Sequence, residues 1–510
     1  MLMVTSMNVV LISTYELGRQ PFGLASPAAW LREAGSNVTC LDLSRSALEE
    51  EPVRLADLVA FYVPMHTATR IAALLIGRVR ELNPQAHLCF FGLYAPINES
   101  YLRGLGADTI LGGEFEEGLL ALVRRLESAP GAQVLLLQAE PTISTARQRF
   151  RVPDRRGLPA LERYARLVSG NGEQRVVGYT EASRGCKHFC RHCPIVPIYQ
   201  GRFRIVQREV VLEDIRQQVD AGASHITFGD PDFFNGVGHA LAVVEDLHRS
   251  HPRLTYDVTI KIEHLLRHSQ YLTTLRDTGC ILVTTAAESI DDRVLRILDK
   301  GHTREDFVRV VALFRNVGLN LSPTFVTFTP WTTLEGYQEL LSFLAELDLV
   351  DSISPIQLAI RLLIPAGSKL LEVPEVSNLI ENFNQKMLSY QWRHSDPRVD
   401  DLYNAVRRIV GRLGALPGAA LGPYQRTPRL LRIPDATSAH QIAPRTAAVG
   451  DPVPAPNLLN PSNNDMRSHV FMQVWDVAQR AAGGLGIVAV PFGPLPARAT
   501  LPYINEPWFC

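Results

Sequence analysis

The stretch "RGCKHFCRHCP", residues 184–194, holds three of the seven cysteines of the chain. Cys186, Cys190 and Cys193 are spaced i, i+4 and i+7 in a segment with loop composition. At that spacing three thiolates can converge on a single metal centre. The stretch therefore predicts a metal site. The identity of the metal and the function of the site have to be inferred from the rest of the sequence.

Two kinds of metal site fit three clustered cysteines. A closed structural zinc site needs four ligands, and His188 or His192 would have to supply the fourth. Such sites usually come as paired Cys-x-x-Cys half-sites, and this sequence has no second one. An iron–sulfur cluster is also held by thiolates, and three of them on a four-iron cluster leave one iron open. An open iron can bind a small molecule, so this reading is favoured over zinc.

Composition sets the context for that site. A chain of 510 residues exceeds what one hydrophobic core usually supports, so we expect two to four domains. The 51 Lys and Arg residues balance 52 Asp and Glu residues, which gives no electrostatic reason to expect nucleic acid or a membrane surface as partner. We expect no signal peptide and no spanning helix, hence a cytoplasmic protein with reduced thiols. Disulfide bonds are therefore a poor explanation for the clustering of the three cysteines.

The first 128 residues alternate short apolar runs with amphipathic, helix-sized intervals. This alternation predicts a doubly wound, Rossmann-like α/β domain with a parallel sheet. Ligands of such sheets bind beyond the carboxyl ends of the strands, where this sequence is rich in Gly, Pro and small polar residues. The expected strands are "NVVLI" (8–12), "NVTCLDL" (37–43), "LVAFYV" (58–63), "HLCFFG" (87–92) and "TILGG" (109–113), and the loops that follow four of them are 13–18, 64–70, 92–98 and 112–118.

Residues 129–175 are expected to form a connector and residues 176–375 a second α/β region. Repeated strand–helix units predict a barrel or partial barrel there, with a helix over 209–221. Residues 376–510 are expected to be mostly helical, from a stretch at 379–411 to a helix near 469–482, with a Pro-rich segment and an extended tail. The strand candidates of the barrel are 225–230, 254–260, 281–289, 321–328 and 356–365.

The cysteine spacing, following the strand "VVGYTEASRG", resembles the radical S-adenosylmethionine (SAM) superfamily. The resemblance implies that Cys186, Cys190 and Cys193 hold a [4Fe-4S] cluster whose open iron chelates SAM. An electron then cleaves SAM to a 5′-deoxyadenosyl radical. It also implies an electron donor such as flavodoxin or ferredoxin as partner.

Two further landmarks recur in the family's order. "TFGDPDFFN" resembles the motif that contacts the amino group of SAM, a role that would fall to Gly229, Asp230 and Asp232. "AAESIDDRVLRILDKGHT" resembles the stretch in which a Glu-Ser pair, here Glu288 and Ser289, approaches the ribose and methionyl end. The chain departs from the pattern with histidine before the third cysteine and with "GDPD" in place of Gly-Gly-Glu. These departures affect the SAM contacts and leave the cluster ligands intact.

A doubly wound domain ahead of such a barrel resembles the cobalamin-binding subgroup. The resemblance implies a corrin lying across the strand-end loops. The usual Asp-x-His-x-x-Gly signature is absent, so we expect no histidine ligand from that motif, and a vestigial domain that binds nothing stays open. The implied cobalamin contacts are Thr14, Pro64, His66, Gly92, Gly112, Gly113 and Glu114.

The end of the chain, "INEPWFC", resembles more weakly the CUAEP/CCAEP-tail radical SAM subgroup, whose chains end with a cysteine or selenocysteine after such a segment. The resemblance implies that Cys510 is either a true terminus or the residue before a selenocysteine codon that was read as a stop.

Together the resemblances imply a cobalamin-dependent radical SAM enzyme, most commonly a methyltransferase acting on an unactivated carbon. The alternatives are a cyclisation or rearrangement enzyme with a vestigial cobalamin domain, and a non-catalytic corrinoid or metal sensor. We expect a small-molecule or peptide substrate, with no nucleic acid and no membrane as partner. The sequence does not identify the substrate.

Overall fold

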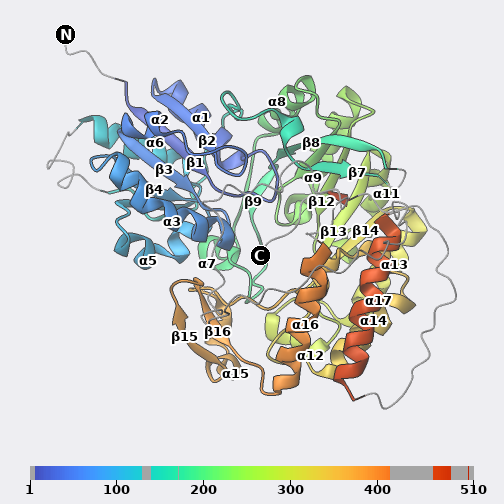
Figure 1. Ribbon diagram of the computed structural model, residues 1–510. Helices are drawn as coiled ribbons and strands as arrows, with labels where there is room; N and C mark the ends of the chain where they lie inside the picture. Colours follow the sequence, from blue (N-terminus) through green and yellow to red (C-terminus); the bar gives the residue numbers. More distant parts are fainter. Residues whose placement is uncertain (1–5, 129–138, 170–171, 414–462, 484–502, 505–510) are drawn as a thin grey trace, which may run out of the picture.

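The computed structural model describes residues 6–128, 139–169, 172–413, 463–483 and 503–504 (Figure 1). Two α/β bodies lie side by side, and a C-terminal region packs below and beside the second one (Figure 1). Among the described helices, none combines the length and the apolar character needed to cross a lipid bilayer.

The first body is a parallel sheet with strand order β2-β1-β3-β4-β5-β6. Helices cover both faces, and each face has its own buried apolar cluster, which confirms the doubly wound prediction. The strands are β1 (Asn8–Ser13), β2 (Asn37–Asp42), β3 (Leu58–Tyr62), β4 (His87–Phe91), β5 (Thr109–Gly113) and β6 (Ile143–Ser144). The helices are α1 (Phe22–Glu33), α2 (Glu50–Arg54), α3 (His66–Leu82), α4 (Tyr94–Ile97), α5 (Glu99–Gly104) and α6 (Glu116–Ser128).

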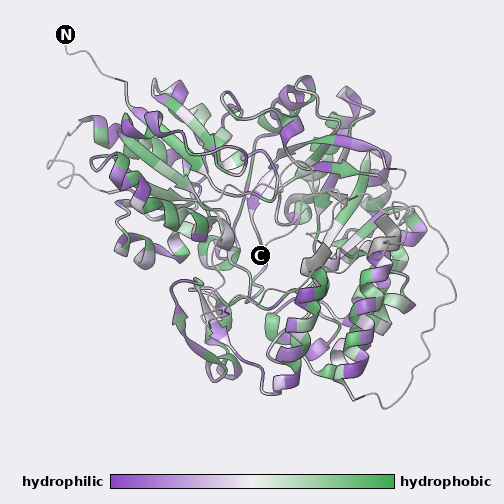
Figure 2. Ribbon diagram, in the orientation of Figure 1, coloured by the Kyte–Doolittle hydropathy of each residue, from purple (hydrophilic) through white to green (hydrophobic). Residues whose placement is uncertain are grey.

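The spacing of apolar residues in the sequence explains how these helices pack on the sheet. In α3, Ala72, Ile76 and Val79 recur three to four positions apart and are buried against one face of the sheet. Leu24 and Leu31 of α1 are buried with the helix α6 on the other face. Figure 2 shows the same division, with hydrophobic residues concentrated on the strands between the two helix layers.

The second body is a curled sheet with strand order β14-β13-β12-β11-β8-β7-β17, whose first five strands run parallel, as expected for a partial barrel. Its strands are β7 (Arg166–Val168), β8 (Gln174–Thr180), β11 (His225–Phe228), β12 (Thr255–Thr259), β13 (Cys280–Glu288), β14 (Asn320–Phe325) and β17 (Tyr503–Ile504). Its helices are α8 (Arg208–Asp220), α9 (Val237–Ser250), α10 (Ile262–Arg267), α11 (Leu272–Asp277), α12 (Asp292–Leu298), α13 (Arg304–Val317) and α14 (Leu334–Glu346).

Short elements complete the two bodies. A small antiparallel pair, β9 (Ser183–Gly185) and β10 (Phe203–Ile205), flanks the cysteine stretch together with α7 (Ile195–Tyr199). The expected connector, residues 129–175, contributes β6 to the first sheet and β7 to the second. The 3₁₀ turns are η2 (Leu161–Arg163), η3 (Phe233–Gly236), η4 (Ser269–Tyr271), η5 (Val350–Ser352), η6 (Pro355–Ala359) and η7 (Lys369–Glu372), and the remaining elements are α15 (Pro374–Ser377), β15 (Ile380–Asn384), β16 (Ser389–Trp392), α16 (Pro397–Leu413) and α17 (Asn463–Ala481).

The strand expected at 356–365 was wrong. Its first half is the 3₁₀ turn η6, because the side chain of Gln357 accepts a hydrogen bond from the Phe325 amide at 3.0 Å and draws the chain into a turn beyond β14. Beyond η6, Arg361 forms a single parallel bridge with Phe328, and Ile364 forms an antiparallel bridge with Tyr390.

The helix expected over 379–411 was wrong in its first part, where β15 and β16 form an antiparallel hairpin. The side chain of Asn384 accepts hydrogen bonds from the amides of Lys386 and Met387, which fixes a turn instead of a helix. The helix α16 begins only at Pro397. Two helices of the C-terminal region are confirmed, since α16 and α17 pack on the core of the barrel through residues such as Val406 and Val474. The Pro-rich segment and nearly all of the expected extended tail lie outside the described residues.

Candidate active site

The three clustered cysteines lie on the loop between β9 and α7, at the carboxyl edge of the barrel. Asn235 of η3 holds the start of this loop, because its Oδ1 accepts from the Lys187 amide at 3.1 Å and its Nδ2 donates to the Gly185 carbonyl at 3.4 Å. The same Oδ1 lies 3.9 Å from the Sγ of Cys186. The Cys193 amide donates to the Cys190 carbonyl at 3.1 Å, which turns the loop back on itself.

The chemistry of these thiols fits a metal cluster. Burial raises the pKa of Cys186, and it raises the pKa of Cys193 to about 12. A buried thiol of that kind is protonated at neutral pH, and coordination to a metal is what deprotonates it. All six cysteines among the described residues are free of disulfides, so the three thiols are available as ligands.

A buried lysine faces the cysteine loop from the barrel. Lys300 is only 3% exposed, and its Nζ lies 3.2 Å from Oε1 of Glu288. Although burial lowers the pKa of this ammonium, the attraction of Glu288 and of Cys190 raises it overall. The positive charge therefore persists beside the place where a thiolate cluster would bring negative charge.

Glu288 stands at the end of β13 in an unusual backbone conformation. Its φ is 64°, in the left-handed region that residues with a side chain rarely adopt. Burial opposes its ionisation, but Lys300 and His192, whose Nε2 is 3.1 Å from Oε1, hold the pKa of the carboxyl well below its usual range. Strained residues of this kind concentrate at functional sites.

A second buried carboxylate contacts the cysteine loop through another histidine. Asp232 is 1% exposed, and its Oδ2 lies 2.7 Å from His264 Nδ1 and 3.4 Å from His188 Nε2. Although burial opposes ionisation, these histidines lower the pKa of Asp232 to about 2. The ligand atoms of Cys186, His188 and Asp232 lie within 4.8 Å of one another, the one such potential metal-binding group among the described residues.

The other residues expected to contact SAM occupy different positions around this site. Asp230 accepts from the Ala182 amide at 2.9 Å and the Ser183 hydroxyl at 2.6 Å, so its carboxylate fixes the strand that leads into the cysteine loop. Burial raises its pKa to about 7. Gly229 packs under Tyr179, whose hydroxyl would lie 1.8 Å from an added Cβ. Ser289 follows Glu288 directly, and its hydroxyl accepts from the Asp291 amide.

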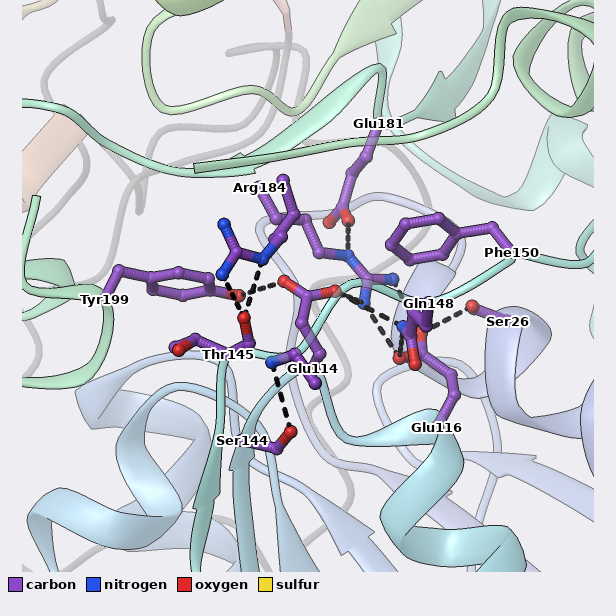
Figure 3. Close-up of polar contacts among 12 residues, drawn as sticks. Ser26, Glu114, Glu116, Ser144, Thr145, Gln148, Phe150, Glu181, Arg184 and Tyr199 are labelled. Atoms are coloured by element: carbon purple, nitrogen blue, oxygen red, sulfur yellow. Dashed lines mark hydrogen bonds and ion pairs between the residues drawn. The ribbon is translucent and has the colours of Figure 1, made fainter. Parts of the chain in front are cut away.

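The loop is anchored to the first body by an arginine two residues before Cys186 (Figure 3). The guanidinium of Arg184 donates to both carboxylate oxygens of Glu116 at 2.9 and 2.7 Å, and to Glu181 at 2.6 Å. The same group lies over the rings of Phe22, Phe115 and Phe150, with its central carbon 5.0 to 5.6 Å from their centroids. A bidentate, ring-enclosed arginine fixes direction as well as position.

Two neighbours complete this anchor. Tyr199 of α7 donates to Glu114 at 3.0 Å, and Gln148 donates to Glu116 at 2.8 Å (Figure 3). Burial raises the pKa of Glu114 to about 7. Burial acts in the same direction on Glu116, but Arg184 outweighs it and lowers the pKa of that carboxyl.

The residues expected to contact cobalamin lie in the strand-end loops, and several are engaged within the chain. Thr14 donates to the Ala68 carbonyl at 2.9 Å, and His66 contacts the Met387 carbonyl through Nε2. A Cβ on Gly92 would lie 3.0 Å from the Val63 carbonyl oxygen, and Pro64 is half-buried. Gly112 and Gly113 allow close packing, since added Cβ atoms would lie 2.1 Å from Pro96 and from the Ser144 oxygen respectively.

The same loops also contain buried polar atoms with no hydrogen-bond partner. They are Ser13 Oγ and Glu16 Oε2 after β1, His66 Nδ1 after β3 and Asn98 Oδ1 after β4. Leaving a buried polar atom unsatisfied costs about 1–3 kcal/mol, so native proteins rarely carry several together without a reason. A bound polar ligand at this edge of the sheet would supply the missing partners.

Sequence reasoning missed two important members of the site. Lys300 lies inside the stretch that resembles the family motif, but nothing in its spacing marked it as the partner of Glu288. His264 had no local signal, because it reaches Asp232 only through the fold of the barrel. Cys510 lies outside the described residues. The resemblance of the chain end to the CUAEP/CCAEP-tail subgroup therefore stays a prediction.

Residues 180–344 match the family model described as the Radical SAM superfamily. The chain carries a radical SAM domain. The three cysteines, Asp232, Glu288 and Lys300 all lie within this segment, and the prediction of a radical SAM enzyme is confirmed at the level of the domain.

Curated relatives match over the same region. A tRNA-2-methylthio-N(6)-dimethylallyladenosine synthase from Moorella thermoacetica is 28% identical over 181 residues, 32% of this chain and 38% of the relative. The synthase of the same name from Chlorobium chlorochromatii is 26% identical over 216 residues, covering 39% and 45%. The chain thus spans less than half the length of these curated relatives.

Solved structures extend the similarity of fold to both bodies of the chain. The cobalamin-dependent SAM radical enzyme OxsB, with aqua-cobalamin and SAM bound, superposes with a TM-score of 0.63 at 15% identity, over 82% of this chain and 68% of that one. The radical SAM methyltransferase TsrM from Kitasatospora setae gives 0.53 at 18% identity, over 67% and 70%. At these identities the likeness concerns the fold, which agrees with the domain arrangement described above.

Proposed function

We propose that this protein is a cobalamin-dependent radical SAM enzyme that modifies an unactivated carbon, with methyl transfer as its reaction. The observation that carries the proposal is the placement of three free cysteines on one loop of the radical SAM domain, whose histidines His192 and His188 contact the buried carboxylates Glu288 and Asp232. A sensor that only binds a metal has no use for two ionised carboxylates, each held by buried cationic or histidine partners, beside the metal loop.

Cys186, Cys190 and Cys193 would hold a [4Fe-4S] cluster, and the donor set fits it. A reduced cluster of this kind supplies the electron that cleaves bound SAM. The role of the chain is to keep the loop in place through Asn235 and Arg184, and to offset cluster charge with the buried ammonium of Lys300. Electrostatic effects of that kind around the sulfurs are known to tune the potential of a cluster.

The two buried carboxylates would bind the methionyl end and the ribose of SAM. Asp232 and Glu288 stay ionised because histidine and lysine partners hold their pKa values down. An ionised carboxylate accepts hydrogen bonds from an ammonium or hydroxyl group, whereas a protonated one would have to donate. Asp230 is occupied with the backbone at Ala182 and Ser183, so we assign it to the support of the loop instead of to SAM.

Cobalamin would lie across the strand-end loops of the first body. The unpartnered polar atoms of Ser13, Glu16, His66 and Asn98 fit a ligand rich in amide groups. The structural neighbours OxsB and TsrM, which have cobalamin bound in their structures, share this two-body arrangement. When bound, the corrin would supply the methyl group, and TsrM is itself described as a methyltransferase.

The substrate is not carried over from any relative. The curated relatives are named for a modified tRNA base, but they share only the radical SAM region with this chain. We place the protein in the cytoplasm, where thiols stay reduced and a cluster can be assembled.

Anaerobic reconstitution tests the proposal. Purified protein is supplied with iron, sulfide and hydroxocobalamin, then assayed for iron, zinc and cobalt and for 5′-deoxyadenosine formed from SAM under dithionite. We expect about four irons, one cobalt and deoxyadenosine. Iron and deoxyadenosine without cobalt would reduce the first body to a scaffold, and zinc without iron or SAM cleavage would overturn the proposal.

A further inference from the structure

The cysteine loop presents an exposed aromatic side chain to the surface. Phe189, between Cys186 and Cys190, is 54% exposed, and Ile205 of the neighbouring strand β10 is 42% exposed. Large apolar side chains with this exposure number eight among the described residues, and Phe189 is the one aromatic ring among them. We call the surface formed by Lys187, Phe189, Arg202, Phe203 and Ile205 the Phe189 patch.

The members of the Phe189 patch adjoin one another. A Cβ on Gly201 would lie 2.4 Å from the Phe189 ring, and Gly201 has a φ of +76°, so glycine is what lets the ring lie against this turn. The ammonium of Lys187 lies 4.8 Å from the centroid of the Phe203 ring. Phe203 and Ile205 both border Gly236, where an added Cβ would lie 3.2 and 3.7 Å from them.

The patch carries positive charge that carboxylates of the chain do not neutralise. Lys187 and Arg202 are exposed, and Arg202 donates to the neutral hydroxyl of Thr145 at 3.1 Å. Arg204 beside it donates to the Thr145 carbonyl at 2.7 Å. In the part of the chain that the structure describes, no ion pair involves Lys187, Arg202 or Arg204.

We propose that the Phe189 patch is the docking surface for an acidic one-electron carrier protein of the flavodoxin or ferredoxin class. The inference rests on the proposed function, because a cluster that cleaves SAM must receive an electron from outside the chain. One electron would pass from the carrier, which would be oxidised, to the cluster held by the three cysteines, which would be reduced, with no covalent bond made or broken.

The position, size and charge of the Phe189 patch favour an acidic electron carrier as its partner. Phe189 is bonded directly to the cluster ligand Cys190, so a carrier seated on its ring comes close to the cluster. An apolar centre with a basic rim matches an acidic partner, whose encounter it would accelerate. Electron-transfer contacts lie at the small, weak end of protein interfaces, and a patch of five residues suits a partner that must leave again.

Charge reversal tests the docking surface by direct binding. Lys187→Glu and Arg202→Glu are combined, and Arg124→Glu, on the exposed side of α6 in the first body, is the matched control. Association of oxidised flavodoxin with the reconstituted protein is measured by calorimetry at low and high salt. We expect the double variant to weaken binding about tenfold or more and the control to stay within twofold.

Kinetics separate docking from catalysis. Deoxyadenosine formation is measured with reduced flavodoxin and, separately, with dithionite, which needs no protein surface. Loss of the flavodoxin-driven rate with an unchanged dithionite-driven rate and unchanged iron content supports the patch. Equal flavodoxin binding by the double variant and the control overturns it. A wild-type protein that cleaves no SAM with dithionite contradicts the proposed function, and the binding measurement then still decides for or against the patch.

Discussion

Two buried carboxyls beside the cysteine loop and two at the strand ends of the first body have pKa values shifted in opposite directions. In the barrel, Asp232 and Glu288 each face buried histidine or lysine partners, and the pKa values of both carboxyls are lowered. In the first body, burial raises the pKa values of Glu16 and Glu114. The two carboxyls beside the cysteine loop are thus kept ionised by histidine and lysine partners, whereas the two at the strand ends of the first body favour the protonated form.

Removal of a cluster cysteine would test the barrel half of this comparison most severely. For Cys193→Ala we expect loss of bound iron and a fall in deoxyadenosine formation of at least about 100-fold, beyond the roughly 10- to 100-fold cost of changes outside the ligand shell. Iron analysis and the SAM cleavage assay measure it. Cys280→Ala removes a buried thiol on β13, away from the cysteine loop, and should retain iron and activity. Retention of iron by Cys193→Ala would contradict the assignment.

Neutralising Glu288 would show how much the paired charges of the barrel contribute to stability. Glu288→Gln leaves the ammonium of Lys300, 3% exposed, without its carboxylate. We expect the free energy of unfolding, measured in urea, to fall by about 3 kcal/mol.

The control for that substitution is an exposed pair in the same chain. Glu372→Gln breaks the contact with Lys369, whose side chain is 42% exposed, and should cost less than about 1 kcal/mol. Similar losses of unfolding free energy for the two variants would mean that the charge of Lys300 does not need Glu288 as its partner.

The pH dependence of stability sharpens the contrast between the bodies. The raised pKa of Glu114, about 7, means that the folded chain holds a proton that the unfolded chain has released above about pH 4. Its contribution to stability is therefore full below about pH 4 and is lost as the pH rises to about 7. Glu114→Gln should flatten the curve of unfolding free energy between pH 5 and 8 by on the order of 2 kcal/mol.

Asp232 should behave in the opposite sense. With its pKa lowered to about 2, its contribution is present above about pH 4 and is lost as the pH falls toward 2. Asp232→Asn should therefore flatten only the acid limb of the same curve. A change at acid pH in the Glu114 variant, or between pH 5 and 8 in the Asp232 variant, would contradict the opposite pKa shifts of the two carboxyls.

The smallest effect is expected where the hairpin β15–β16 touches the first body. His66→Ala removes the contact of Nε2 with the Met387 carbonyl, and it should destabilise the hairpin by about 1 kcal/mol. Hydrogen exchange of the hairpin amides measures this. Arg70→Ala, which removes a longer, exposed contact with the Lys386 carbonyl at 3.2 Å, should change exchange less. Equal effects would show that His66 has no special role there.

Local patterns were enough to predict the parallel core strands of both sheets, because apolar runs and helix-sized intervals determine them within a few residues. The short strands β6, β7 and β17 were not predicted, and the strand expected at 356–365 was wrong. The cysteine loop and the placement of Asp232 and Glu288 at strand ends were also predictable. The hairpin at 380–392 was not, since a single side chain, Asn384, decides its turn. Partners distant in sequence were beyond reach as well: Glu116 lies 68 positions before Arg184, and no local spacing connects them.

The anchor at Arg184 would make metal binding by the cysteine loop depend on the packing of the two bodies against each other. The strand before Cys186 is fixed by a carboxylate from α6, by rings from α1 and the connector, and by Glu181 of its own body. A chain whose first half is unfolded lacks most of these groups, so its cysteine loop has no fixed start. Exchange of the first body for that of a relative would have to bring Glu116 and Phe115 with it, or the recipient barrel would lose the alignment of its cluster loop.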